Sequence, residues 1–425
     1  MNSFGWDTVF ALDNDQVNKA ISNSWNQLPQ SFDYSEDGFH MSGQFSPWMV
    51  VNGGSGSLLH LKLPVTSGSI ALDSSKPADL VGVAAVVEVD MRLLPSSTKA
   101  ETQELRMNLK QAVKIGTPGG EGLVVPITVV DPQGKLGQTY SSLFLEGMAR
   151  WMVANANQIT YVFAEINFAK PDRNSWLTPV QCNFVCADRE DKTKPGYLGI
   201  LSVNSNRDIS KLERKIDPAI LPISAQLNAG YLISGDLFLQ NVILPLMPQM
   251  YHGTSLGTFA FSATDHQIQN TTKFPADKVK SGAIWYYPEI KHLKVYIVGG
   301  ELRTDIQGDC DLYAGISMTF SLNIKNTMSF DPKTQNVRFN PDPSPHADHD
   351  ADIPWYYWFL TPIGEAITQI VVAAISDSIA NSLKSDISIN VEGIPTQSVH
   401  WTGAGQDMQV TQAGLNTCFY MQGIV

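Results

Sequence analysis

The chain has 425 residues, of which 43% are hydrophobic and 16% charged, and it contains 32 glycines and 24 prolines. This composition is typical of a turn-rich globular protein with much β structure, and the length indicates two domains, or three. The net charge of −12, without any cluster of Lys or Arg, argues against binding to nucleic acid or to an anionic bilayer by counterion release.

Two helices are predicted in the first half of the chain. Asp13 or Asn14 can cap the first one, in which apolar residues recur at helical spacing over residues 17–28. Pro29 ends this stripe. The second helix is predicted at about residues 139–155, where large apolar side chains again fall on one face.

Long strands separate and follow these helices. Residues 81–93 and 105–115 alternate between apolar and polar side chains, which predicts antiparallel sheets with one dry and one wet face. Such strands exceed the usual length and must bend or coil. Further strands are predicted at residues 159–168, 180–187 and 197–203.

The pattern starts again near residue 206. Short helices are predicted at residues 209–215 and 234–244, and residues 314–324 form the clearest alternating strand in the chain. The order of helix, long strands, long helix and short strands thus occurs twice. We therefore expect two modules, residues 1–205 and 206–425, with exchange of a strand or helix between them left open.

The longest predicted helix covers residues 361–384. Its apolar face repeats at i, i+3, i+4 and i+7 and consists of β-branched residues and alanines, so the helix is slim and about 36 Å long. A curled sheet can approach such a helix closely. The sequence therefore predicts an α+β fold in which long helices are wrapped by highly curved antiparallel β-sheets.

Compact catalytic motifs are absent from the sequence. It has no nucleophile elbow, no H-E-x-x-H, no P-loop, no G-x-G-x-x-G and no paired C-x-x-C, which favours a protein that is not an enzyme and has no cofactor. His346 and His349 lie among aspartates in residues 341–352 and offer ligands to a divalent ion. A solvated loop is the favoured interpretation, so no metal site is predicted.

Cysteines and targeting signals indicate a soluble protein. Four cysteines do not form a disulfide framework, and Cys182 and Cys186 are too far apart in an extended strand to bridge each other. The first ten residues lack the features of a signal peptide, and the most apolar run, residues 367–375, is too short to span a bilayer. We expect a cytoplasmic protein that is released, if at all, without a signal peptide.

The N-terminal motif resembles that of a known family. Residues 4–10, FGWDTVF, followed by Val17 and Asn18, resemble the start of the forty-seven-kilodalton accessory proteins encoded beside OrfX proteins in clostridial botulinum neurotoxin clusters. Similar proteins occur in insecticidal-toxin loci. That family is similar in fold to the tubular lipid-binding (TULIP) superfamily, so the resemblance implies a TULIP-like fold with lipid between helix and sheet. It implies no catalytic residues.

These observations favour a non-enzymatic protein that binds a lipid or another hydrophobic small molecule and serves a bacterial toxin gene cluster. Two alternatives stay open: a scaffold with a filled cavity that binds other toxin-cluster proteins, and a metal-dependent enzyme that uses residues 346–352. The residues expected to line the hydrophobic groove come from one strand and one helix. They are Ile316, Met318, Phe320, Ile367, Ile370, Ala374 and Ile375.

Overall fold

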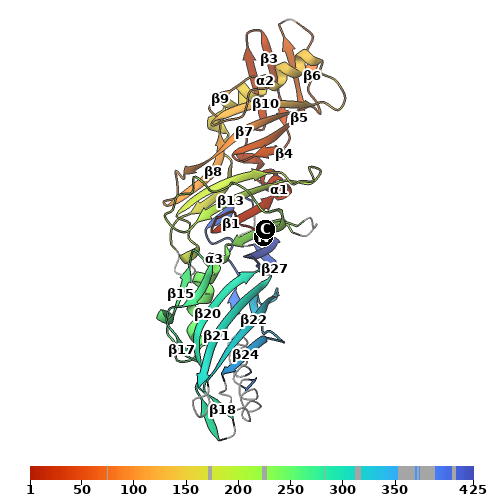
Figure 1. Cartoon of the computed structure of the whole chain (residues 1–425). Coiled ribbons are helices and arrows are strands. Elements are labelled where there is room, and N and C mark those ends of the chain that lie inside the picture. Colours follow the sequence, from red (N-terminus) through yellow and green to blue (C-terminus); the bar gives the residue numbers. More distant parts are fainter. Residues whose placement is uncertain are drawn as a thin grey trace. The chain divides into compact units, whose positions relative to one another are not determined.

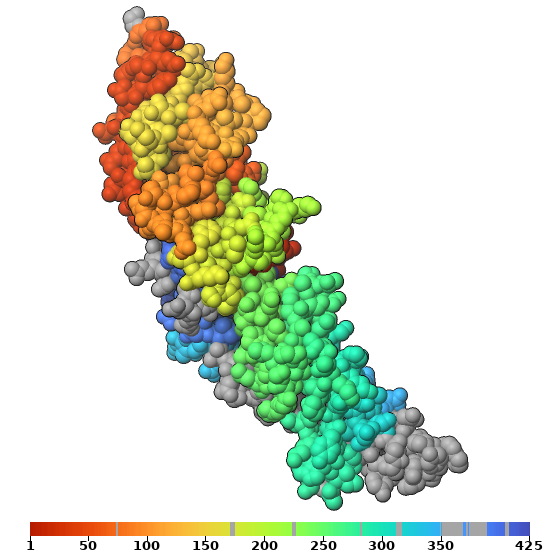
Figure 2. All heavy atoms as spheres, turned by 90° about the vertical axis from the view of Figure 1, so that its left-hand side faces the viewer, coloured from red at the N-terminus to blue at the C-terminus, as the bar shows by residue number. Residues whose placement is uncertain are grey.

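The computed structural model describes residues 1–73, 75–170, 175–222, 227–281, 283–311, 317–352, 369–370, 373, 388–403 and 408–425. The chain divides into two compact units (Figure 1). Unit 1 comprises residues 1–3, 232–392 and 410–421, and unit 2 comprises residues 4–231, 393–409 and 422–425. Figure 2 shows the green and turquoise residues of unit 1 as a continuous surface on the face drawn. The modules 1–205 and 206–425 stay a prediction.

Helices are short throughout the part of the chain that the structure describes. They are α1 (Asn14–Asn23), α2 (Gln138–Ala154), α3 (Gly235–Phe238) and α4 (Met247–Met250), with single turns η1 (Trp25–Gln27), η2 (Ala156–Gln158), η3 (Ser175–Leu177), η4 (Pro218–Ile220), η5 (Leu239–Ile243), η6 (Leu244–Leu246) and η7 (Leu256–Thr258).

The largest sheet belongs to unit 2 and has the order β2-β3-β5-β7-β8-β11-β26, with β4 and β6 paired to β5 and with β10 paired to β7 and β9. Its strands are β2 (Ser31–Glu36), β3 (Phe39–Phe45), β4 (Met49–Ser55), β5 (Leu58–Leu72), β6 (Ala78–Asp79), β7 (Ala84–Pro95), β8 (Thr102–Asn108), β9 (Gln111–Ala112), β10 (Leu123–Val130), β11 (Val162–Asn167) and β26 (Val399–Trp401). In the same unit β1 (Thr8–Asp13), β12 (Gln181–Ala187) and β13 (Tyr197–Val203) pair in the order β12-β13-β1.

The nine-stranded sheet of unit 1 has the order β15-β16-β20-β21-β22-β23-β25, with β17 paired to β20 and β24 paired to β22. Its strands are β15 (Phe259–Ser262), β16 (Gln267–Asn270), β17 (Phe274–Pro275), β20 (Glu289–Val298), β21 (Glu301–Asp311), β22 (Ser317–Asp331), β23 (Asn336–Asn340), β24 (His346–Asp352) and β25 (Ser388–Asn390). The hairpin of β18 (Val279–Ser281) and β19 (Ile284–Tyr286) is a separate two-stranded sheet. The remaining strands are β14 (Ala229–Ile233), β27 (Gln409–Asn416) and β28 (Cys418–Ile424).

Both helices predicted in the first half are confirmed. Asp13 caps α1, because its carboxylate accepts a hydrogen bond of 2.8 Å from the backbone N–H of Gln16. Helix α1 ends at Asn23, earlier than the apolar stripe indicated, and the single turn η1 follows it. Helix α2 buries Phe144, Met148 and other large apolar residues on one face, as its spacing predicts.

The long strand β5 changes partners along its length. Residues from Leu58 to Pro64 pair with β7, and several of them pair with β4 on the other side. From Val65 to Leu72 the strand instead pairs with β3, and two of its residues also pair with β6. The partners change where the pairing of β5 with β3 shifts register, between Gln44 and Phe45, an irregularity of the kind that bends a long strand.

Two glycines in the sheets lie beneath aromatic rings. Gly43 on β3 is the cross-strand partner of Phe32 on β2, and Gly308 on β21 is the partner of Phe320 on β22. A Cβ added to Gly308 would lie 2.4 Å from Cζ of Phe320. The rings occupy the space that a side chain at each glycine would need, which fixes the register of the neighbouring strands.

The predicted α+β, TULIP-like fold with long helices wrapped by sheets is wrong. The structure is dominated by strands, and the longest helix among its described residues, α2, has 17 residues. In unit 1 the helical stretch from α3 to α4 is not a regular α-helix but changes between α, π and 3-10 hydrogen bonding, because Pro245 and Pro248 lack the N–H that a regular helix needs. The helix predicted at residues 361–384 lies outside the described residues apart from residues 369, 370 and 373.

Two local predictions also fail. The helix predicted at residues 209–215, a stretch described throughout, is replaced by turns, and the carbonyl of Glu213 accepts a 2.8 Å hydrogen bond from the indole N–H of Trp6. The solvated loop predicted at residues 341–352 contains strand β24 instead. Its register runs from His346 opposite Asn323 to Asp352 opposite Ser317. Pairing with the long β22 therefore overrides the loop-like composition.

The sequence analysis predicted unpaired cysteines and no segment that spans a bilayer. All four cysteines are free, as expected. Burial raises the pKa of the Cys186 thiol to about 12 and that of the Cys310 thiol to about 11. Among the described residues, no helix is long and apolar enough to cross a membrane.

Candidate ligand-binding faces of the nine-stranded sheet

Strand β22 has one apolar and one polar face. Met318, Phe320, Leu322 and Ile324 alternate along it and are only 1–3% exposed. Ile306 on β21, the cross-strand partner of Leu322, is 1% exposed and lies on the same face. The alternation read from the sequence therefore corresponds to a fully buried apolar face.

Only part of the predicted groove lies among the described residues. Met318 and Phe320 belong to the buried face of β22, whereas the side chain of Ile370 is 39% exposed. The other predicted lining residues lie outside the described residues; they are Ile316, Ile367, Ala374 and Ile375. Their joint role as a hydrophobic groove stays a prediction.

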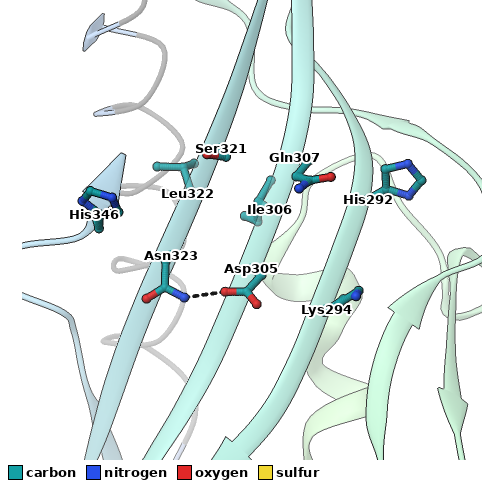
Figure 3. Close-up of a pocket in the computed structure, with 9 residues that line it drawn as sticks. All are labelled: His292, Lys294, Asp305, Ile306, Gln307, Ser321, Leu322, Asn323 and His346. Atoms are coloured by element: carbon teal, nitrogen blue, oxygen red, sulfur yellow. Dashed lines mark hydrogen bonds between the residues drawn. The ribbon is translucent and has the colours of Figure 1, made fainter. Parts of the chain in front are cut away.

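The opposite face of the same strands carries a polar hollow of about 470 Å³, which we call the polar groove (Figure 3). The cross-strand register brings one row of side chains together over four strands. In chain order, this row consists of Lys294 on β20, Asp305 on β21, Asn323 on β22 and His346 on β24. The next row adds His292, Gln307 and Ser321.

Asp305 is the centre of the hydrogen bonding in the polar groove. The amide of Asn323 donates a hydrogen bond to one of its oxygens, and Figure 3 shows the two side chains pointing toward one another. The phenol of Tyr296 donates to the other oxygen over 3.0 Å. Burial, and then this hydrogen bond to Asp305, raise the pKa of Tyr296, so the phenol keeps its proton and remains a donor.

A second hollow of about 370 Å³ extends the polar groove along the strands. Gln307 and Ser321 line both hollows, and Asp350 on β24 borders the second. Thr319 donates a weak hydrogen bond of 3.4 Å to the backbone carbonyl of Asp350. Nearby, Lys291 and Asp309 form an ion pair with an N–O distance of 2.6 Å. The lining consequently offers many hydrogen-bond donors and acceptors and charges of both signs.

The metal-binding alternative depended on residues 346–352. The side chains of His346 and Asp348 are highly exposed and 3.6 Å apart, and His349 is placed on β24 opposite Phe320. Within the described parts of the chain, no group of three His, Cys, Asp or Glu side chains is placed to hold a metal ion.

Sequence reasoning missed the polar groove. Its residues come from four strands that are separated by up to 54 positions, and only the register of pairing places them in rows. The one available signal was the alternation of polar residues in β22, because these had to share a face opposite the apolar ones. That pattern identifies β22 but not the strands that pair with it.

These sheets define a two-unit protein built mainly from antiparallel strands with short helices. The sequence matches the OrfX-like family, described as Protein OrfX2/OrfX3/P47, over residues 3–398. The chain therefore belongs to this family, which confirms the resemblance found at its N-terminus.

Individual relatives agree with this assignment. Protein P47 of Clostridium botulinum (strain Kyoto / Type A2) is 27% identical over 436 residues, covering 100% of this chain and 99% of the relative. Protein OrfX3 of the same strain is 23% identical over 350 residues, covering 74% of this chain and 70% of the relative. The solved structure of P47 from Clostridium botulinum A2 has a TM-score of 0.78 and 26% identity, covering 100% of this chain and 98% of that one. P47 of Clostridium botulinum E1 gives 0.77 and 25%, covering 99% of each chain.

Proposed function

We propose that the chain is a non-enzymatic accessory protein of a bacterial toxin gene cluster that binds a lipid or another hydrophobic ligand. Membership of the OrfX-like family supports the accessory role. The apolar face of β22 supports the ligand class, because Met318, Phe320, Leu322 and Ile324 line it without a charged group. A hydrocarbon chain lying along such a strip gains about 0.8 kcal/mol for each buried methylene.

Three tryptophan variants on one strand test this proposal. Met318→Trp adds bulk to the apolar face, Ser321→Trp adds bulk to the polar groove, and Thr327→Trp adds it at an exposed position outside both. The purified protein is extracted with organic solvent, and native mass spectrometry compares its mass before and after extraction. Uptake of a fluorescent fatty acid is then measured for each variant that unfolds at the same temperature as the unmodified chain.

A lipid in the extract and saturable uptake of the fatty acid are the expected results. Met318→Trp should lower the affinity for the fatty acid, whereas Thr327→Trp should leave it unchanged. The proposal fails if no lipid co-purifies and the extracted protein takes up no fatty acid. It also fails if Met318→Trp and Thr327→Trp both bind the fatty acid as tightly as the unmodified chain does.

The polar groove favours a second candidate, a scaffold that binds other proteins of the cluster. Its lining combines amides, a hydroxyl, imidazoles and the Lys294 and Asp305 charges over four strands, which suits an extended polar segment of a partner better than a hydrocarbon. Pull-down with OrfX-type proteins tests this candidate. Ser321→Trp should abolish retention and Thr327→Trp should preserve it; equal retention by both would exclude the groove.

A further inference from the structure

The β18–β19 hairpin of unit 1 exposes large apolar side chains. Ile284 and Trp285 are each 45% exposed and Tyr287 is 69% exposed. In Figure 1 the hairpin lies at one end of unit 1, beyond the ends of β20 and β21, and its residues reach the surface at the lower end of Figure 2. Val279 and Tyr286, which pair across the hairpin, are each 4% exposed and anchor it.

Two lysines flank the exposed indole. The ammonium groups of Lys278 and Lys280 lie 4.8 Å and 5.6 Å from the ring centroid of Trp285. Both lysines are exposed, and the sequence from Lys278 to Tyr287 contains no acidic residue. The indole and the two cations therefore lie together on the hairpin, while Ile284, on the opposite face, is exposed at the start of β19.

We propose that this hairpin docks on the surface of a bilayer that contains anionic phospholipid. Trp and Tyr side chains favour the boundary between headgroups and acyl chains, where an apolar ring and a polar tip are both accommodated. Ile284 enters the acyl region, and Lys278 and Lys280 reach the lipid phosphates. The inference concerns the β18–β19 hairpin of unit 1 and stands whether or not the apolar face of β22 holds a ligand.

Charge complementarity favours an anionic membrane surface as the binding partner of the hairpin. Of the acidic groups that flank the hairpin in sequence, Glu289 forms an ion pair with Lys273 at an N–O distance of 2.8 Å. Asp277 lies 3.4 Å from the imidazole of His252, which balances its charge only when it is protonated. The chain as a whole carries −12 and is repelled by the same surface. Attraction is therefore confined to the hairpin, and it weakens with added salt because exposed charges are screened over about 10 Å at 0.1 M.

Flotation of the full chain with lipid vesicles tests the proposal. Vesicles of phosphatidylcholine mixed with phosphatidylserine are compared with vesicles of phosphatidylcholine alone, at low and at high salt. We expect binding to the mixed vesicles at low salt. Trp285→Ala should weaken it about tenfold, and each of Lys278→Gln and Lys280→Gln about fivefold.

Matched controls remove an exposed apolar side chain and an exposed cation elsewhere in unit 1. Leu256→Ala alters a side chain that is 57% exposed, and Lys325→Gln removes an exposed cation from β22. Both should bind vesicles as the unmodified chain does. Because all five changed positions are at least partly exposed, thermal unfolding should be unchanged and serves as the folding check.

Three results would overturn the proposal. The first is no flotation with the mixed vesicles at low salt. The second is equal flotation by Trp285→Ala and the unmodified chain. The third is that the unmodified chain binds no vesicles but binds a protein partner that the hairpin variants do not bind. That result would make the hairpin a protein-binding site instead. The fatty-acid uptake described above is measured without vesicles, so the two proposals succeed or fail separately.

Discussion

Replacing Gly43 by alanine should destabilise unit 2, because no space exists for a methyl group there. A Cβ at this position would lie 2.3 Å from the carbonyl oxygen of Ser67 and 3.0 Å from Cα of Gly68, both on the neighbouring strand β5. It would also lie 2.8 Å from Cζ of Phe32. The backbone at Gly43 has no positive φ, so the clash alone sets the cost.

The magnitude follows from the distances. An ordinary contact begins at 3.4 Å, so β3 and β5 would have to separate by about 1 Å, which stretches the hydrogen bonds between them. Overpacking of this kind costs about 1–3 kcal/mol. We expect Gly43→Ala to lower the free energy of unfolding by about 2–3 kcal/mol and the midpoint of thermal unfolding by about 5–10 °C.

Urea and thermal unfolding, followed by circular dichroism, measure this change. Gly120→Ala is the matched control in the same unit, because its added Cβ would be 3.4 Å from the nearest atom and its φ is not positive. The control should change the free energy of unfolding by less than about 0.5 kcal/mol. If Gly43→Ala is as stable as the control, the close approach of β3 and β5 is refuted.

Other predictions concern the helix cap, the thiols and a buried carboxylate. Asp13→Ala removes the cap of α1 and should cost about 1 kcal/mol in urea unfolding, with Asp13→Asn as the conservative control; equal loss in both would exclude capping. Cys186 and Cys310 should resist alkylation at pH 8 until urea unfolds the chain, and rapid labelling of the native protein would contradict their burial. Burial raises the folded-state pKa of both thiols above the ordinary 9.0. The stability that these protonated thiols contribute is therefore complete below pH 9 and is lost between pH 9 and about 12. An unchanged urea midpoint from pH 8 to pH 10.5 would contradict this. Asp90 is 4% exposed and accepts hydrogen bonds from Asn108 and a backbone N–H, so Asp90→Ala should lower the free energy of unfolding by about 1–3 kcal/mol, and a loss within error would show that these donors find other partners.

Local patterns in the sequence predicted several elements well. The cap at Asp13 and the apolar stripe after it define α1 from neighbouring residues alone. The alternation in β22 also predicted its buried face, because the apolar side chains must leave water together. In such cases the information lies within the element itself.

Elements that depend on distant partners were predicted poorly. Strand β24 is rich in His and Asp, which are typical of loops, and its strand structure comes from pairing with β22. The polar groove likewise depends on the register between β20, β21, β22 and β24, which no single segment encodes. The prediction of long helices wrapped by curved sheets was wrong for a related reason. An apolar sheet face shows that other residues must cover it, but not whether one long helix or several short helical segments do so.

The partner change along β5 has a consequence for how unit 2 opens. Its first half is hydrogen-bonded to β4 and β7, and its second half to β3 and β6, on one continuous backbone. A strand shared in this way transmits fraying from one group of neighbours to the other. The amide protons of β3 and β7 should therefore exchange with solvent in a single cooperative step, so that this part of the molecule behaves as one foldon despite its two sets of pairings.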